Sequence, residues 1–138
     1  MTSIASEKRR AQAISFASIL FYITGSFGVI GVFLTLPYTL QNRAFPVYPI
    51  IGETWGGGFF DTLGLDSELL LILLFMIVSM LELVVGWGLW NSRRSGARLG
   101  LILLPVGIVL SVGLVLPIWM LLHPVKLGLL LLKWKSLR

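Results

Sequence analysis

The sequence predicts an all-α integral membrane protein that forms a single domain over residues 1–138. Two observations predict this class: 57% of the residues are hydrophobic against 12% charged, and the mean hydropathy is +0.93. A water-soluble globule of this length needs more polar residues to cover its surface. We therefore expect the chain to reside in a lipid bilayer.

Long apolar runs predict three membrane-spanning helices, at about residues 11–36, 68–90 and 98–116. The second run is the clearest, because residues 69–90 contain one charged side chain, Glu82. A helix of that length extends about 33 Å, which exceeds the roughly 30 Å of a hydrocarbon core. A proline follows the first span, and we expect Pro37 to end it because proline removes a helical hydrogen bond.

For the C-terminal region, the sequence predicts a short membrane-embedded or interfacial helix at about residues 124–136. The stretch from Lys126 to Lys133 covers only about 10 Å of helix, too little to cross a bilayer. The alternative is four transmembrane helices, with the fourth beginning near Leu116. That arrangement would place His123 and Lys126 near the midplane, where a lysine costs about 3 kcal/mol on insertion scales. Three spans plus a short helix is the preferred interpretation.

Basic residues predict the orientation of the chain. The first ten residues contain three Lys or Arg, whereas the segment 38–67 contains only Arg43. The segment between the second and third spans carries an arginine cluster, composed of Arg93, Arg94 and Arg98. By the positive-inside rule, the N-terminus is cytoplasmic and residues 38–67 form an extracytoplasmic loop. We expect the arginine cluster to contact anionic lipid headgroups.

The arginine cluster belongs to a Gly-Trp-Gly-Leu-Trp-Asn-Ser-Arg-Arg-Ser-Gly-Ala-Arg-Leu-Gly passage. This passage resembles the hairpin of two helices joined by a basic turn that many small bacterial multi-spanning membrane proteins of unknown function contain. The resemblance carries no activity with it. It agrees with a bacterial-type cytoplasmic membrane as the location.

Small residues at helical spacing predict where the helices pack on one another. They are Gly25 and Gly28 in the first span, and Gly107 and Ser111 in the third. In lipid, association depends on close backbone contact, which small side chains permit. We therefore interpret these positions as packing faces.

Glu82 is the one acidic residue inside a predicted span. An ionisable residue at that depth is by default a functional candidate. Counting residues from the helix ends places it level with Ser18 and Tyr22, and no lysine is expected at its level. One hypothesis is a protonated Glu82 that hydrogen-bonds Tyr22 or Ser18, for which Glu82→Gln would be nearly neutral. The other is a residue that carries protons or cations.

His123 is the only histidine of the chain. It is a candidate axial ligand for a chlorophyll-type pigment or a haem, or else an interfacial residue at a helix break. One histidine, no cysteine and one buried acid cannot assemble a zinc site, a Ser-His-Asp triad or a carboxylate pair. We therefore expect no catalytic residues, no metal site and no enzyme activity. The sequence requires no cofactor and leaves its identity unknown, and we expect lipid as a small-molecule partner.

These observations favour a non-catalytic small subunit that packs on and stabilises a larger membrane protein complex. Its glycine faces and the aromatic loop at 38–67 would bind other membrane protein subunits, in addition to lipids. One alternative is a homo-oligomeric small transporter or channel with Glu82 at its axis, and another is a pigment- or haem-associated subunit that uses His123. The net charge of +5 does not indicate nucleic-acid binding, because the basic residues flank apolar runs.

Overall fold

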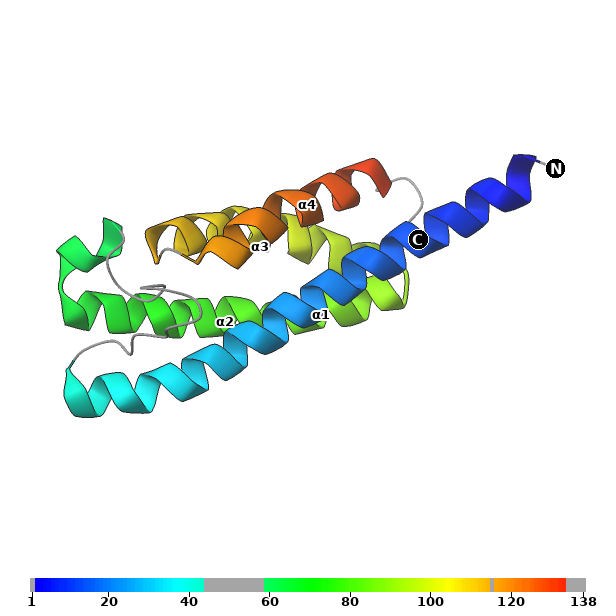
Figure 1. The fold of residues 1–138 in the computed structure, drawn as a ribbon. Coiled ribbons are helices and arrows are strands. Elements are labelled where there is room, and N and C mark those ends of the chain that lie inside the picture. The colour runs from blue at the N-terminus through cyan, green and yellow to red at the C-terminus, as the bar shows by residue number, and fades with distance from the viewer. Residues whose placement is uncertain (1, 44–58, 115, 134–138) are drawn as a thin grey trace.

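The computed structural model describes residues 2–43, 59–114 and 116–133, which form four α-helices and one short 3-10 helix (Figure 1). Three segments are long and apolar enough to cross a membrane, whereas the last helix is shorter. The predicted all-helical class and three helices of spanning length are therefore confirmed. The elements are α1 (Thr2–Asn42), η1 (Phe59–Leu63), α2 (Leu65–Trp90), α3 (Arg94–Gly113) and α4 (Pro117–Lys133).

The four helices run alternately in opposite directions along the bundle (Figure 1). One end of the bundle holds the N-terminal part of α1, the turn between α2 and α3, and the end of α4; we call it the basic end. The opposite end holds the C-terminus of α1, η1 and the start of α2; we call it the linker end. The N-terminal part of α1 extends beyond the other helices at the basic end (Figure 1).

Two predicted helix boundaries are wrong for one shared reason, a proline that lies inside the helix. Pro37 lies inside α1, which continues to Asn42, and Pro124 lies inside α4, which begins at Pro117 instead of residue 124. Each internal proline removes a single backbone donor, and the adjacent turns continue the helix. At its N-terminus α4 begins with proline, the residue favoured in a first helical turn. The third helix likewise begins earlier than predicted, at Arg94.

The segment predicted as an extracytoplasmic loop, residues 38–67, is partly helical. Its first residues belong to α1, and its last ones belong to η1 and α2. Residues 44–58 lie outside the described part of the chain. Binding of other membrane protein subunits by this segment therefore stays a prediction.

A close glycine contact sets the hairpin of α2 and α3. A Cβ atom built on Gly88 would lie 2.8 Å from the Cα of Gly96, a distance that real side chains do not adopt. Arg93 donates its backbone N–H to the carbonyl of Gly88, 2.9 Å away, and closes the turn. The two helices can approach this closely because neither residue carries a side chain.

The interior contains two apolar clusters, one toward each end. The basic-end cluster consists of Ile14, Ala17, Phe21, Val85, Leu89, Ala97, Leu103, Leu104 and Leu130. The linker-end cluster consists of Val32, Ile72, Phe75, Val78, Leu110, Leu114 and Leu116. Between the two clusters lies a layer of polar side chains.

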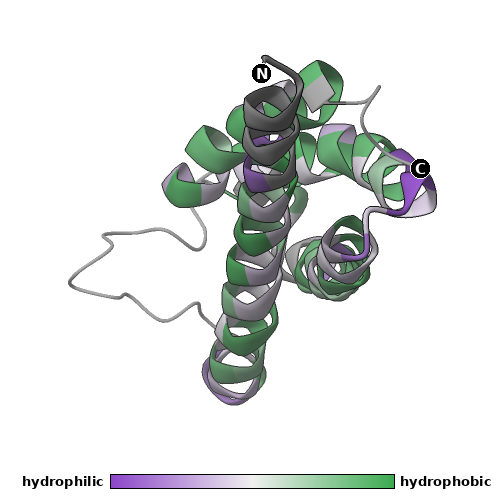
Figure 2. Ribbon diagram, turned by 90° about the vertical axis from the view of Figure 1, so that its right-hand side faces the viewer, coloured by the Kyte–Doolittle hydropathy of each residue, from purple (hydrophilic) through white to green (hydrophobic). Residues whose placement is uncertain are grey.

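Hydrophobic residues predominate along the helices (Figure 2), and many of the large ones are exposed on the outside of the bundle. Large side chains such as Phe27, Leu34 and Leu70 are each more than 60% exposed. Monomeric water-soluble proteins rarely expose contiguous apolar surface of this extent. This exterior suits a hydrocarbon environment.

Candidate functional site

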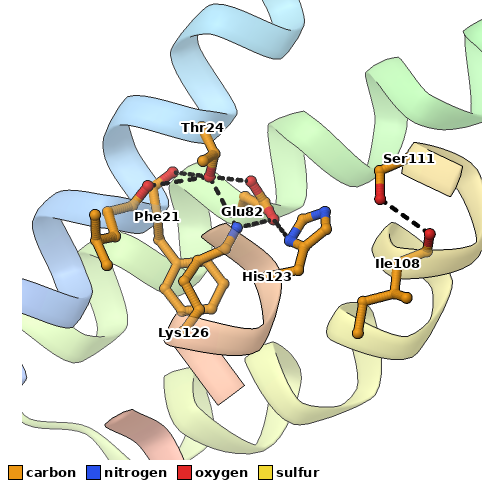
Figure 3. A network of polar contacts seen from close by, with 8 residues as sticks. Phe21, Thr24, Glu82, Ile108, Ser111, His123 and Lys126 are labelled. Carbon is orange, nitrogen blue, oxygen red and sulfur yellow. Dashed lines mark hydrogen bonds and ion pairs between the residues drawn. The ribbon is translucent and has the colours of Figure 1, made fainter. Parts of the chain in front are cut away.

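A buried ion pair occupies the polar layer, and we call its members with their direct neighbours the Glu82 cluster. It comprises Thr24 of α1, Glu82 of α2, and His123 and Lys126 of α4 (Figure 3). The side chains of Glu82 and Lys126 are 3% and 0% exposed. Three helices thus bring a carboxylate, an ammonium, an imidazole and a hydroxyl together inside an apolar bundle.

Glu82 and Lys126 form the centre of the cluster. The Nζ atom of Lys126 donates to Oε1 of Glu82 at 2.5 Å. Lys126 also lies over the ring of Phe21, with Nζ 4.5 Å from the ring centroid. In a desolvated setting both the carboxylate and the aromatic face stabilise an ammonium. The paired arrangement explains how a lysine can lie at this depth, because an isolated charge there would be far more costly.

Thr24 connects the two charged groups. Its Oγ1 donates to Oε2 of Glu82 at 2.5 Å and accepts from Nζ of Lys126 at 2.9 Å. The hydroxyl has one proton, so the carbonyl of Leu20, 3.0 Å away, is an alternative acceptor for it. Both oxygens of Glu82 therefore have a partner, which a buried carboxylate requires.

His123 completes the cluster without sharing these hydrogen bonds. Its Nδ1 atom lies 3.7 Å from Oε1 of Glu82. The residue is 1% exposed, and neither ring nitrogen makes a hydrogen bond of ordinary geometry to the described residues. A Cβ atom on Gly107 would lie 2.9 Å from Nε2 of His123, so the ring rests directly on the α3 backbone. Only glycine at position 107 leaves space for this ring.

The cluster can exchange a proton among three groups. Carboxylate, imidazole and amine each exist in two protonation states, and all three lie within one turn of each other in depth. Oε1 of Glu82 lies near two groups that can be cations. A protonated His123 would therefore compete with Lys126 for this oxygen atom. Ionisable residues that pair with one another inside a membrane bundle often mark proton relays or ion pathways.

The partners of Glu82 differ from those expected from the sequence. Ser18 donates to the backbone carbonyl of Gly86, at 2.7 Å, and Tyr22 packs beside Gly86. Neither residue reaches the carboxylate, whose hydrogen bonds come from Thr24 and Lys126. The expectation that no lysine lies at this level is also wrong, because α4 extends far enough to bring Lys126 there.

The sequence nevertheless contains information that places Lys126 at the same depth in the bundle as Glu82. Glu82 lies eight residues before the end of α2, and Lys126 lies seven residues before the end of α4. At 1.5 Å per residue these offsets differ by less than a third of a turn. The pairing was missed because the helix was expected to begin at Pro124, which put Lys126 in its first turn. No comparable signal singles out Thr24 among the threonines of α1.

The small residues highlighted by the sequence lie between helices of this chain. A Cβ atom on Gly25 would lie 2.7 Å from the carbonyl oxygen of Ser79, and one on Gly28 would overlap the Ser79 side chain. Gly107 contacts His123, and Ser111 is buried and donates to the carbonyl of Ile108 at 2.9 Å. These faces are therefore occupied within the bundle.

The arginine cluster lies at the basic end, and its three residues are exposed. Arg93 precedes α3, and its guanidinium carbon lies 4.8 Å from the ring centroid of Trp87. Arg94 and Arg98 belong to the first turns of α3. Contact between this cluster and lipid headgroups stays a prediction.

No group of three or more His, Cys, Asp or Glu that could hold a metal ion occurs among residues 2–43, 59–114 and 116–133. His123 is enclosed by α2, α3 and α4, with one ring edge on Gly107 and the other toward Glu82. A pigment or haem would have to displace these contacts to reach the ring. Ligation by His123 therefore stays a prediction without geometric support.

Comparison with known proteins adds no family to this picture. No family model, no curated protein and no solved structure matches the chain. The function is therefore argued from the Glu82 cluster alone.

Proposed function

We propose that this chain is an integral membrane protein that transfers protons through the Glu82 cluster. The observation that carries the proposal is the position of Glu82, whose Oε1 lies 2.5 Å from Nζ of Lys126 and 3.7 Å from Nδ1 of His123. An ionisable residue inside a membrane bundle is costly, and such residues typically mark proton relays or substrate sites.

The expected location is a bacterial-type cytoplasmic membrane with the N-terminus in the cytoplasm. The apolar exterior supports membrane insertion, and the distribution of basic residues supports the orientation. The course of α4 adds a further argument, because it runs back to the basic end (Figure 1). That direction brings Lys133, the last residue of α4, to the same side as the arginine cluster, as the positive-inside rule requires.

The transfer proceeds in balanced steps. A proton binds Nε2 of His123 and makes the imidazolium, and Nδ1 then gives its proton to Oε1 of Glu82. Lys126 releases a proton toward the basic end and becomes a neutral amine, and Glu82 passes its proton to Nζ. One proton has entered at His123 and one has left at Lys126, and each side chain has its starting charge again. His123 now carries its proton on Nε2 instead of Nδ1, so the proton must return to Nδ1, by a turn of the ring or by exchange, before the next transfer.

The distance between Nδ1 and Oε1 must shorten for the first transfer. At 3.7 Å the two atoms are beyond hydrogen-bond distance, and they would approach when His123 becomes charged. Entry from the linker end requires the linker-end cluster to open, and exit toward the basic end requires the basic-end cluster to open, because apolar side chains fill both halves of the interior. A change of helix packing is therefore part of the proposed cycle.

Infrared difference spectroscopy on the purified protein in nanodiscs tests the proposal. We expect a carbonyl band of a protonated carboxylic acid that titrates with pH in the wild type and is absent in Glu82→Gln. Asp66→Asn is the matched control, since it also converts a carboxylate to an amide, at a side chain that is 93% exposed. A wild-type spectrum without a titrating band that Glu82→Gln removes would refute proton transfer through Glu82.

Proteoliposomes loaded with a pH-sensitive dye give a second measurement. We expect the wild type to dissipate a pH gradient at least about tenfold faster than empty liposomes, with Glu82→Gln at the background rate and Asp66→Asn unchanged. Equal rates in the wild type and Glu82→Gln would show that the cluster does not conduct.

A small subunit of a larger membrane complex is the second proposal. The glycine faces no longer support it, because Gly25, Gly28 and Gly107 pack inside this chain. It now depends on the aromatic segment 38–67, whose central part lies outside the described residues. Gentle purification from the native membrane tests it: co-purification of larger subunits would support this proposal, and an isolated protein would contradict it.

A further inference from the structure

An apolar layer lies beside the Glu82 cluster, on the side of the basic end. Each of the four helices contributes one residue to this layer: Phe21 of α1, Val85 of α2, Gly100 of α3 and Leu130 of α4. Each side chain is three or four residues along its helix from a member of the Glu82 cluster, which is about one turn. The three side chains are at most 2% exposed, and Gly100 is buried as well. We call these four residues the exit layer, because they separate the ion pair from the basic end.

Gly100 is the point at which the side chains of the exit layer meet. A Cβ atom built there would lie 3.0 Å from Cγ1 of Val85, 3.1 Å from Cδ1 of Leu130 and 3.3 Å from Cζ of Phe21. Side chains of three other helices therefore converge on the bare backbone of one residue. Interiors packed this closely contain few voids as large as a water molecule. The exit layer therefore closes the bundle on this side, as the linker-end cluster does on the other.

Phe21 is the member of the exit layer that also contacts the ion pair. Its ring tip lies against Gly100, and its ring centroid lies 4.5 Å from Nζ of Lys126 (Figure 3). Helical side chains lean toward the N-terminus of their helix, and α1 begins at the basic end, so the ring lies on the basic side of the ammonium. A cation within about 6 Å of an aromatic face is attracted by the ring quadrupole. The aliphatic side chains of the layer offer no such attraction.

The attraction between the ring and the ammonium matters most at one step of the proposed cycle. Glu82 receives a proton before Lys126 releases one, and a neutral carboxyl group no longer balances the charge of the ammonium. Two contacts of Nζ remain at that step, the hydroxyl of Thr24 and the ring of Phe21. The ring therefore stabilises the charged lysine just when the lysine has to lose its proton, and it slows the release.

We infer that Phe21 is the exit gate of the proton path. Its ring keeps Lys126 in the ammonium form and closes the exit layer, and the proton leaves when the ring moves away from Lys126 and Gly100. Phe21 exchanges no proton itself. The inference rests on the proposed proton transfer and deepens it, because it names the residue that controls the rate of release.

Phenylalanines with one, two or three fluorine atoms, incorporated at position 21 alone, test the attraction at nearly constant shape. Each fluorine withdraws electron density from the ring face and weakens its attraction for a cation. In the proteoliposome assay we expect the rate of proton transfer to rise with each fluorine, to about fivefold with three. The same series at Phe75, which is buried in the linker-end cluster, is the matched control and should leave the rate unchanged. Equal rates across the series at position 21 would overturn the inference.

Phe21→Leu tests the closure, because it removes the ring and keeps an apolar side chain. We expect proton transfer at least about threefold faster than in the wild type, and an unchanged rate in Phe75→Leu. NMR of the full chain in nanodiscs tests the contact without any transport, since an aromatic ring shifts the signals of protons above its face. We expect the side-chain signals of Lys126 to move in Phe21→Leu and to stay in Phe75→Leu. Unmoved signals in Phe21→Leu would overturn the inference.

Failure of this inference and failure of the proposed function give different results. A wild type that conducts no faster than empty liposomes refutes proton transfer, and the exit gate with it. A wild type that conducts, with the same rate in the fluorinated proteins, keeps proton transfer and overturns the gate. A slower rate in a Phe21→Leu variant that folds would also overturn the gate, because removing a barrier cannot slow the release. The fluorinated proteins keep the shape of the ring, so the test does not depend on the folding of Phe21→Leu.

Discussion

Removing either charge of the Glu82–Lys126 pair should destabilise the bundle, whereas removing both should not. The atoms are 2.5 Å apart and their side chains are at most 3% exposed, so neither charge has water to replace its partner. Breaking a buried pair from one side typically costs about 3–5 kcal/mol, while replacing both members by neutral groups is often close to neutral. We therefore expect Glu82→Gln and Lys126→Met each to cost about 3 kcal/mol, and the double variant about 1 kcal/mol or less.

Unfolding in mixed micelles of increasing dodecyl sulfate content, followed by circular dichroism, measures these free energies. The double-mutant cycle isolates the pair, because Gln and Met keep the approximate shapes of Glu and Lys. We expect a coupling energy of at least about 2 kcal/mol. Effects that add to within about 0.5 kcal/mol would show that the two charges do not stabilise each other and would refute the pairing. The structure thus reverses the nearly neutral Glu82→Gln expected from the sequence.

Three further predictions address packing and orientation. Gly25→Ala should destabilise the bundle by about 1–3 kcal/mol, because its Cβ would lie 2.7 Å from the Ser79 carbonyl oxygen. Gly128→Ala is the control: a Cβ atom there has no neighbouring atom within 4 Å, so this variant should stabilise the bundle by up to about 1 kcal/mol in the same assay. Gly107→Ala should displace the ring of His123 and shift its imidazole NMR signals, and unchanged signals would contradict the contact. Replacing all three residues of the arginine cluster by Glu should cause misinsertion in a cysteine-accessibility map, and unchanged topology would show that other segments set the orientation.

The helices themselves were predictable because hydrophobicity over a window is a local property. Residues 69–90 have a mean hydropathy high enough that no context is needed to assign them to a span. The predicted helix boundaries were wrong at two prolines. The rule that a proline ends a helix considers only the proline itself, whereas the adjacent turns can keep the chain helical. At Pro37 and Pro124 the helix continues on both sides.

The candidate site was half predictable. Glu82 is identified by its isolation in an apolar run, and small residues such as Gly107 mark where helices approach. The identity of its partners depends on how far α4 enters the bundle, which composition alone does not determine. Only with α4 starting at Pro117 does Lys126 reach the level of the carboxylate, and only the rotation of α1 decides between Thr24 and Ser18.

The ion pair between the second and the fourth helix also bears on biosynthesis. During synthesis α2 must enter the bilayer before α4 has left the ribosome, so Glu82 spends that interval without Lys126. We expect Glu82 to be protonated during that interval, because a neutral carboxyl group enters hydrocarbon at far lower cost than a carboxylate. Once α4 docks, the pair forms and helps to hold in place a helix that is shorter than the three segments of spanning length. A chain that fails at this last step would present an unpaired lysine within the membrane, a feature by which quality-control proteases could distinguish unfinished molecules from finished ones.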